Sequence, residues 1–131
     1  MARAFKLGDF RAGYYRDQTL LLALGAVTVE QLFAQLYADA NEQREPSSAG
    51  RQMNAHFATP LLDPEGGWLT HVDRFNSAAD LSPTGAQMPK LVGLAYASRL
   101  YRALPNLEGF AGFSRKGDEI AFGTIGNASC A

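Results

Sequence analysis

Cysteine and histidine are scarce in this sequence. The single cysteine, Cys130, cannot form an internal disulfide, and no second cysteine is present to build a zinc knuckle or a redox pair. The two histidines, His56 and His71, stand at irregular spacing from Asp63 and Asp73, without the i, i+4 pairing of helical zinc sites. These shortages argue against a zinc hydrolase. They fit a reducing compartment, so we expect a cytoplasmic protein.

An excess of either charge is also missing, as is any long apolar run. The formal net charge is -1, so no basic face is available to neutralise the phosphates of a nucleic acid. No segment approaches the run of about 18 apolar residues that crosses a membrane, and residues 1–10 lack the apolar stretch of a signal peptide. We therefore expect neither a nucleic acid nor a membrane as a partner.

The remaining composition is that of an ordinary soluble globular protein. Of the 131 residues, 47% are hydrophobic and 19% are charged, which is far from the signature of disorder. A chain of this length has room for one domain with a modest hydrophobic core. We therefore expect a single domain over residues 1–131.

Two helices are predicted in the first third of the chain. Asp17 is a plausible cap for a short buried helix over residues 17–25, which carries several leucines and ends in a glycine. Thr28 and Gln31 have the spacing of a capping box, and apolar residues then recur at helical intervals. This pattern predicts an amphipathic helix over residues 28–37.

Later segments predict loops, one more helix and a strand. Polar and turn-forming residues predict loops over residues 41–50, 60–79 and 105–117, and the second is long enough to be a functional loop that lines a site. Residues 88–104 are apolar around much of a helix and predict a buried one. Residues 120–125 predict a short buried parallel strand.

Helices ahead of a buried strand that runs into a small-residue turn predict an open α/β sheet. In such sheets the ligand lies at the carboxyl ends of the strands. Because only one strand is predicted, the fold looks incomplete.

Four short blocks could carry chemistry. Residues 14–17 place a guanidinium beside aromatic rings, which can clamp a phosphate or carboxylate. Residues 82–87 gather hydroxyls and an amide before a helix, and residues 123–129 would let backbone amides approach a diphosphate while an oxygen binds Mg²⁺. The fourth block, residues 50–53, is followed by His56. Each also has a structural interpretation: a surface arginine, a helix entry, a tight turn or a hydrogen-bonding histidine.

Taken in order, these blocks resemble the alpha-type region of the decarboxylating component of 2-oxo acid dehydrogenases, especially the branched-chain kind. The blocks are Tyr14-Tyr15-Arg16-Asp17, Gly50-Arg51-Gln52-Met53, Ser82-Pro83-Thr84-Gly85-Ala86-Gln87-Met88-Pro89 and Ile125-Gly126-Asn127-Ala128-Ser129. The resemblance covers the chain from about Gly13 onward. It implies a partial thiamine-diphosphate-binding open parallel-sheet α/β domain, an N-terminal fragment truncated at its cofactor motif and inactive by itself.

The resemblance also implies roles for single residues. The implied cofactor-binding residues are Tyr15, Arg16, Ser82, Thr84, Gly126, Asn127 and Ala128. Arg16 would meet the diphosphate, and the turn from Ser82 would meet the aminopyrimidine ring through its backbone. Asn127 would be the Mg²⁺ ligand, although relatives carry a carboxylate there. His56 would lie toward the active site as the catalytic residue, and Gln87 would be a structural or ion-site residue.

The function implied by this resemblance is oxidative decarboxylation of a branched-chain 2-oxo acid, with acyl transfer to lipoamide. The implied cofactors are thiamine diphosphate and Mg²⁺. The implied partners are a beta-type subunit, or a fused beta-type region, and the lipoyl-bearing acyltransferase component. One alternative is a non-catalytic binding or interaction domain that keeps the fold. In that alternative, Asn127 in place of an acid would mark the loss of the chemistry. Another is an α/β phosphate-binding domain unrelated to this family.

Overall fold

A small parallel sheet organises the chain. The computed structural model describes residues 1–130 apart from the side chain of Glu108, so residue 131 of the predicted domain lies outside it. The strands are β1 (Phe10–Tyr14), β2 (Asn76–Leu81) and β3 (Ala121–Phe122), in the order β2-β1-β3. Both neighbours pair with β1 in parallel. The predicted α/β class with an open parallel sheet is confirmed.

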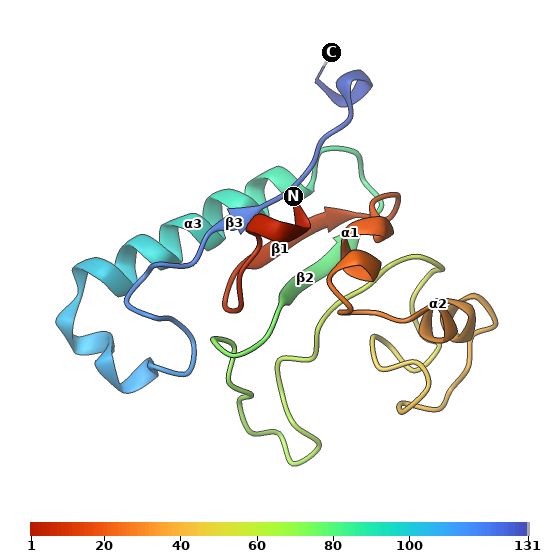
Figure 1. Ribbon diagram of the computed structural model, residues 1–131, viewed down its shortest axis with the longest axis horizontal. Coiled ribbons are helices and arrows are strands. Elements are labelled where there is room, and N and C mark those ends of the chain that lie inside the picture. The colour runs from red at the N-terminus through yellow and green to blue at the C-terminus, as the bar shows by residue number, and fades with distance from the viewer. Residues whose placement is uncertain (131) are drawn as a thin grey trace.

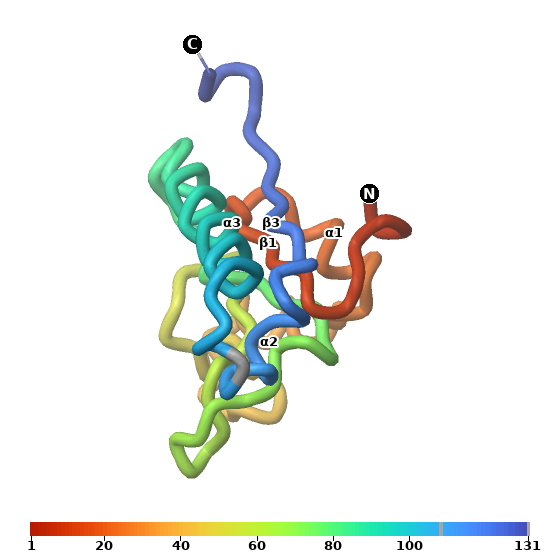
Figure 2. The backbone as a smooth tube through the Cα atoms, turned by 90° about the vertical axis from the view of Figure 1, so that its left-hand side faces the viewer, coloured from red at the N-terminus to blue at the C-terminus, as the bar shows by residue number. Residues whose placement is uncertain are grey.

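Helices lie on both sides of this sheet. The helices are α1 (Gln18–Ala23), α2 (Val29–Leu36) and α3 (Gln87–Ala103), with short 3-10 turns η1 (Ala2–Ala4), η2 (Pro105–Phe110) and η3 (Asn127–Ser129). Figure 1 shows α3 running alongside the strands while α2 stands apart from them. Figure 2 shows α3 and α1 on opposite sides of the sheet. None of the described helices is both long and apolar enough to cross a lipid bilayer.

All three predicted helices form, but their burial differs from the prediction. The capping box of α2 is present in full, since the Thr28 hydroxyl accepts from the Gln31 amide and the Gln31 side chain accepts from the Thr28 amide. The prediction that α3 is buried is wrong, because Val92 is 71% and Tyr96 58% exposed. The sheet covers only one side of α3, so its other side faces outward.

The strand predictions were only partly correct. The predicted strand over residues 120–125 shrinks to the two residues of β3, which are half-buried at the edge of the sheet. The central strand β1 was not predicted, and the predicted loop over residues 60–79 is wrong at its end, where β2 begins. Both missed strands carry buried polar side chains, which hide the apolar pattern of a strand.

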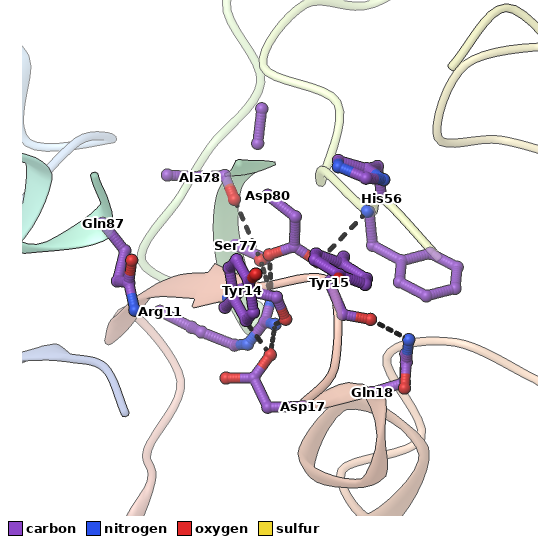
Figure 3. Close-up of polar contacts among 12 residues, drawn as sticks. Arg11, Tyr14, Tyr15, Asp17, Gln18, His56, Ser77, Ala78, Asp80 and Gln87 are labelled. Carbon is purple, nitrogen blue, oxygen red and sulfur yellow. Dashed lines mark hydrogen bonds and ion pairs between the residues drawn. The ribbon is translucent and has the colours of Figure 1, made fainter. Parts of the chain in front are cut away.

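Those polar side chains form an ion network beneath the carboxyl edge of the sheet. Arg11 in β1 is fully buried. Its Nη1 donates to Ser77 Oγ and to Asp80 Oδ1, each at 2.7 Å. Its Nη2 donates to the carbonyl of Tyr14 at 3.5 Å and to the carboxylate of Asp17 (Figure 3). Burial raises the pKa of Asp80, and the adjacent Arg11 opposes that rise.

Two backbone features make room for this network. Ser77 and Asp80 would face opposite sides of a regular strand, but the register between β1 and β2 shifts after Ala78, so both side chains reach Arg11. Gly13 is needed because a Cβ there would overlap the Arg11 guanidinium. The space that the buried Arg11 takes therefore requires glycine at position 13 of β1.

The apolar core is small by comparison. Leu21, Val27 and Phe57 form the buried cluster, and Leu22 and Leu32 pack against it. Much of the remaining buried surface in the described chain is polar, which makes hydrogen-bond and charge satisfaction decisive for the fold.

Arg11→Met should destabilise the protein by about 3–5 kcal/mol, because it leaves the buried Asp80 carboxylate without its cation. Urea unfolding followed by circular dichroism measures the loss. The matched control is Arg115→Met, whose ion pair with Asp73 at 2.9 Å is more than half exposed on both sides. The control should lose less than about 1 kcal/mol. Equal losses in the two variants would contradict a stabilising role for the network.

Candidate functional site

The carboxyl edge of the sheet gathers three of the four sequence blocks, and the fourth block, residues 50–53, contributes Met53. Tyr15 and Arg16 follow β1, Ser82 follows β2, and the turn from Gly126 follows β3. Because the strands are parallel, these three strand ends meet at one edge. Two adjoining cavities of about 620 and 590 Å³ open there, and Arg16 lines both.

The two cavities contain every site residue predicted from the sequence. Those in the larger cavity are Arg16, Thr84, Gly126, Asn127 and Ala128. Those in the other cavity are Tyr15, Arg16, His56 and Ser82. The segments come together from distant parts of the chain, and the site is therefore composed by the fold and not by any single loop.

Arg16 supplies an exposed positive charge to both cavities. Its Nε donates to the Tyr15 hydroxyl at 3.0 Å, and its guanidinium lies 5.1 Å from the centre of the Tyr15 ring. Tyr14 and, to a smaller extent, Arg16 lower the pKa of Tyr15. The Tyr15 hydroxyl holds the Nε of Arg16 and its ring lies beside the guanidinium, so the terminal nitrogens of Arg16 stay available to an anion.

The turn after β3 forms the opposite wall of the larger cavity. The Ser129 amide donates to the Gly126 carbonyl at 2.9 Å, and the Ala128 amide donates to Asn127 Oδ1 at 2.9 Å. Asn127 thus offers one neutral oxygen that already accepts one hydrogen bond. Among the side chains that the structure describes, no group of three or more His, Cys, Asp or Glu is placed to hold a metal ion.

The other cavity centres on His56. Its ring stacks on that of Tyr15 at 5.6 Å and an interplanar angle of 6°. Its Nε2 lies 2.6 Å from Ser82 Oγ, and its Nδ1 lies 3.0 Å from the backbone carbonyl of Asn54. Since a carbonyl only accepts, the Nδ1 must carry a proton, and the Nε2 of the neutral ring accepts from the Ser82 hydroxyl.

A hydrogen-bonded turn precedes His56, and a side chain of α2 contacts the His56 backbone. Glu45 is buried, and its carboxylate accepts from the amides of Ser47, Ser48 and Gly50. Gly50 has a positive φ of 72°, and a Cβ there would lie 2.5 Å from a backbone oxygen. Further on, the buried Gln35 side chain of α2 donates to the His56 carbonyl. The loop predicted over residues 41–50 is therefore a tightly hydrogen-bonded turn.

Sequence reasoning missed the contacts that join the walls of the site. Asp17 sits at the start of α1 as predicted, but its side chain does not cap the helix. It accepts from Arg11 and, at 2.8 Å, from the Thr124 hydroxyl. Gln87, which also lines the larger cavity, is buried and donates to the Thr124 carbonyl at 2.9 Å. No local pattern signals these contacts, because Thr124 is remote in sequence from both partners.

A third cavity lies at the opposite end of the strands. It has a volume of about 340 Å³ and is lined by Phe10 and Ala121, the first residues of β1 and β3, with aromatic rings from Trp68 and Phe113. His71 stacks between Phe10 and Phe113, and burial lowers its pKa. Both ring nitrogens of His71 are buried, so they do not reach the cavity. This apolar cavity contains none of the predicted site residues.

One curated protein gives a comparison. The chain is 30% identical over 121 residues to the 2-oxoisovalerate dehydrogenase subunit alpha of Bacillus subtilis (strain 168). The match covers 92% of this chain but only 27% of the relative, so the chain spans about a quarter of that protein's length. No protein-family profile matches the chain, and no solved structure matches it significantly. The likeness supports a distant relationship to alpha subunits of 2-oxo acid dehydrogenases.

The His56 geometry predicts one tautomer. In the neutral ring the proton should sit on Nδ1, because Asn54 offers only a carbonyl, and ¹⁵N chemical shifts of the imidazole measure this directly. Ser82→Ala should keep the proton on Nδ1 while it removes the donor to Nε2. His71 is a built-in comparison, because neither of its ring nitrogens has a hydrogen-bond partner among the described residues. A proton on Nε2 of His56 would contradict the arrangement.

Proposed function

We propose that this chain is part of the decarboxylating component of a thiamine-diphosphate-dependent 2-oxo acid dehydrogenase. In this proposal it is the alpha-type part, and residues 1–131 are a single, incomplete domain. One observation carries the proposal: all the residues implied by the family resemblance line two adjoining cavities at the carboxyl edge of one parallel sheet. The distant relationship to the Bacillus subtilis subunit also supports it.

The larger cavity fits a diphosphate. Arg16 gives a cation whose terminal nitrogens are not engaged by the protein in the contacts described, and guanidinium pairs bidentately with phosphate oxygens. Across the cavity, Gly126 begins a turn of small residues that lets the backbone approach an anion closely. In the proposal, Arg16 and this turn hold the two ends of the diphosphate, and Thr84 lines the side between them.

The proposed Mg²⁺ site needs few ligands from the protein. Mg²⁺ in proteins often uses one or two protein oxygens, with waters and phosphate oxygens for the rest. Asn127 Oδ1 can supply such an oxygen, although the hydrogen bond that it accepts from the Ala128 amide competes with a metal for it. We propose Asn127 as the one side-chain ligand of Mg²⁺ from this chain.

Thiamine diphosphate, when bound, supplies the carbanion chemistry that releases carbon dioxide from a 2-oxo acid. The residues of this chain would position the ligand and control a proton beside it. Tyr15 and Arg16 fix one side of the ligand, and the turn at Ser82 and Thr84 fixes another. His56 is the proposed catalytic residue, because its Nε2 accepts from the Ser82 hydroxyl beside the cavity and could exchange a proton there.

The whole-protein properties belong to the same proposal. They are a branched-chain 2-oxo acid as substrate, acyl transfer to lipoamide, a beta-type subunit or fused region as partner, the lipoyl-bearing acyltransferase component, and a cytoplasmic location. The competing function is a binding module that keeps the fold without chemistry. The neutral Asn127 favours that alternative, because a carboxylate would hold Mg²⁺ more strongly.

Arg16→Ala should weaken binding of thiamine diphosphate with Mg²⁺ by at least about tenfold, because it removes the cation of the cavity. Titration calorimetry on the chain measures the dissociation constant. Arg99→Ala on the exposed side of α3 removes one positive charge away from both cavities and should change little. If the unaltered chain binds no thiamine diphosphate, or if both variants weaken binding equally, the proposal fails.

Asn127→Asp should tighten Mg²⁺-dependent binding of the same cofactor, because a carboxylate adds charge to the metal ligand. The measurement is a Mg²⁺ titration at fixed thiamine diphosphate, with Ca²⁺ and no metal as comparisons. Asn106→Asp in η2 adds the same charge away from both cavities and is the matched control. An equal Mg²⁺ dependence in the unaltered chain and both variants would refute Asn127 as a metal ligand. In the binding-module alternative, binding is independent of Mg²⁺ in all three proteins.

A further inference from the structure

The two walls of the larger cavity are held together by one side-chain contact. Asp17 Oδ2 accepts from the Thr124 hydroxyl at 2.8 Å, and the two residues come from opposite ends of the chain. Asp17 directly follows Arg16, and Thr124 stands two residues before Gly126. The contact therefore joins the residue next to the cation of the cavity with the segment that leads into the opposing turn.

The segment after β3 has little other support. β3 pairs with β1 through only two residues, Ala121 and Phe122. In the described structure, the hydrogen bonds that reach residues 124–130 from elsewhere in the chain both end on Thr124, one from its hydroxyl to Asp17 and one to its carbonyl from Gln87. The position of the turn relative to Arg16 thus depends on Thr124.

Asp17 is itself held firmly. Its Oδ1 accepts from the buried Arg11 and, at 3.2 Å, from the Tyr14 amide, which leaves Oδ2 directed to Thr124. Arg11, which Asp17 shares with Asp80, offsets part of the negative charge that Asp17 would otherwise present to an anion in the cavity. The Asp17 side chain does not cap α1, and its hydrogen bonds go instead to Arg11, Tyr14 and Thr124.

We propose that Asp17 and Thr124 are positioning residues that set the span between Arg16 and the turn at Gly126, and so the fit of a diphosphate group between them. Neither residue is proposed to take part in the reaction. The inference rests on the proposed function for the identity of the ligand. The structural part, that Thr124 holds the turn in place, stands on the contacts alone.

The test compares Thr124→Val, which keeps the shape but removes the hydroxyl, with Thr124→Ser, which keeps the hydroxyl. Two readouts are taken on the chain: titration calorimetry with thiamine diphosphate and Mg²⁺, and hydrogen exchange of the Ala128 and Ser129 amides by NMR. Thr124→Val should weaken binding by about tenfold, the worth of one partly buried hydrogen bond to a carboxylate, and speed exchange at both amides. Thr124→Ser should restore both.

The two readouts separate the two ideas. If the unaltered chain does not bind the cofactor, the proposed function fails. Faster exchange in Thr124→Val would then still support the conclusion that Thr124 holds the turn in place. If the chain binds and Thr124→Val binds equally well with unchanged exchange, the positioning role is overturned and the proposed function stands. Urea unfolding of all three proteins checks that the half-buried Thr124 has no general effect on stability.

Discussion

A guanidinium that is fully removed from water has to be neutralised and hydrogen-bonded, and Arg11 imposes that requirement on the centre of this fold. Asp80 meets it from β2, and Asp17 meets it from the start of α1. Gly13 leaves the space, and the register shift of β2 turns Asp80 toward the charge. The central strand, its neighbour and the first helix are thus fixed relative to one another by a single cation.

The same network reaches the surface where the site lies. Asp17 carries the contact from Arg11 to Thr124, and the backbone between Asp17 and Tyr14 carries Tyr15 and Arg16. A displacement of Arg11 would therefore move both walls of the larger cavity. Stability and site geometry are coupled here, because the site is built on the ends of strands that the buried ion network aligns.

The sequence alone predicted the helices and the fold class, while the candidate site residues came from a family resemblance. The Thr28 capping box and the apolar period of α2 are local patterns, which can be recognised in the sequence without knowledge of the fold. The residues of the site were found by resemblance, and the structure places them in adjoining cavities. β1 and β2 escaped prediction because Arg11, Ser77 and Asp80 look like polar surface residues until their pairing across the sheet is known. The burial of α3 was overestimated because composition does not show how much of a helix a small sheet can cover.

The charge balance of the larger cavity follows from these contacts. Of the residues that line it, Arg16 is the cation and Asp17 is the anion, and the two are adjacent in sequence. A direct ion pair between them would occupy the guanidinium of Arg16. Arg11 and the Thr124 hydroxyl instead engage both oxygens of Asp17, while Arg16 turns to Tyr15. Because Asp17 is held by Arg11 and Thr124, it does not pair with Arg16, and the terminal nitrogens of Arg16 stay exposed at the cavity.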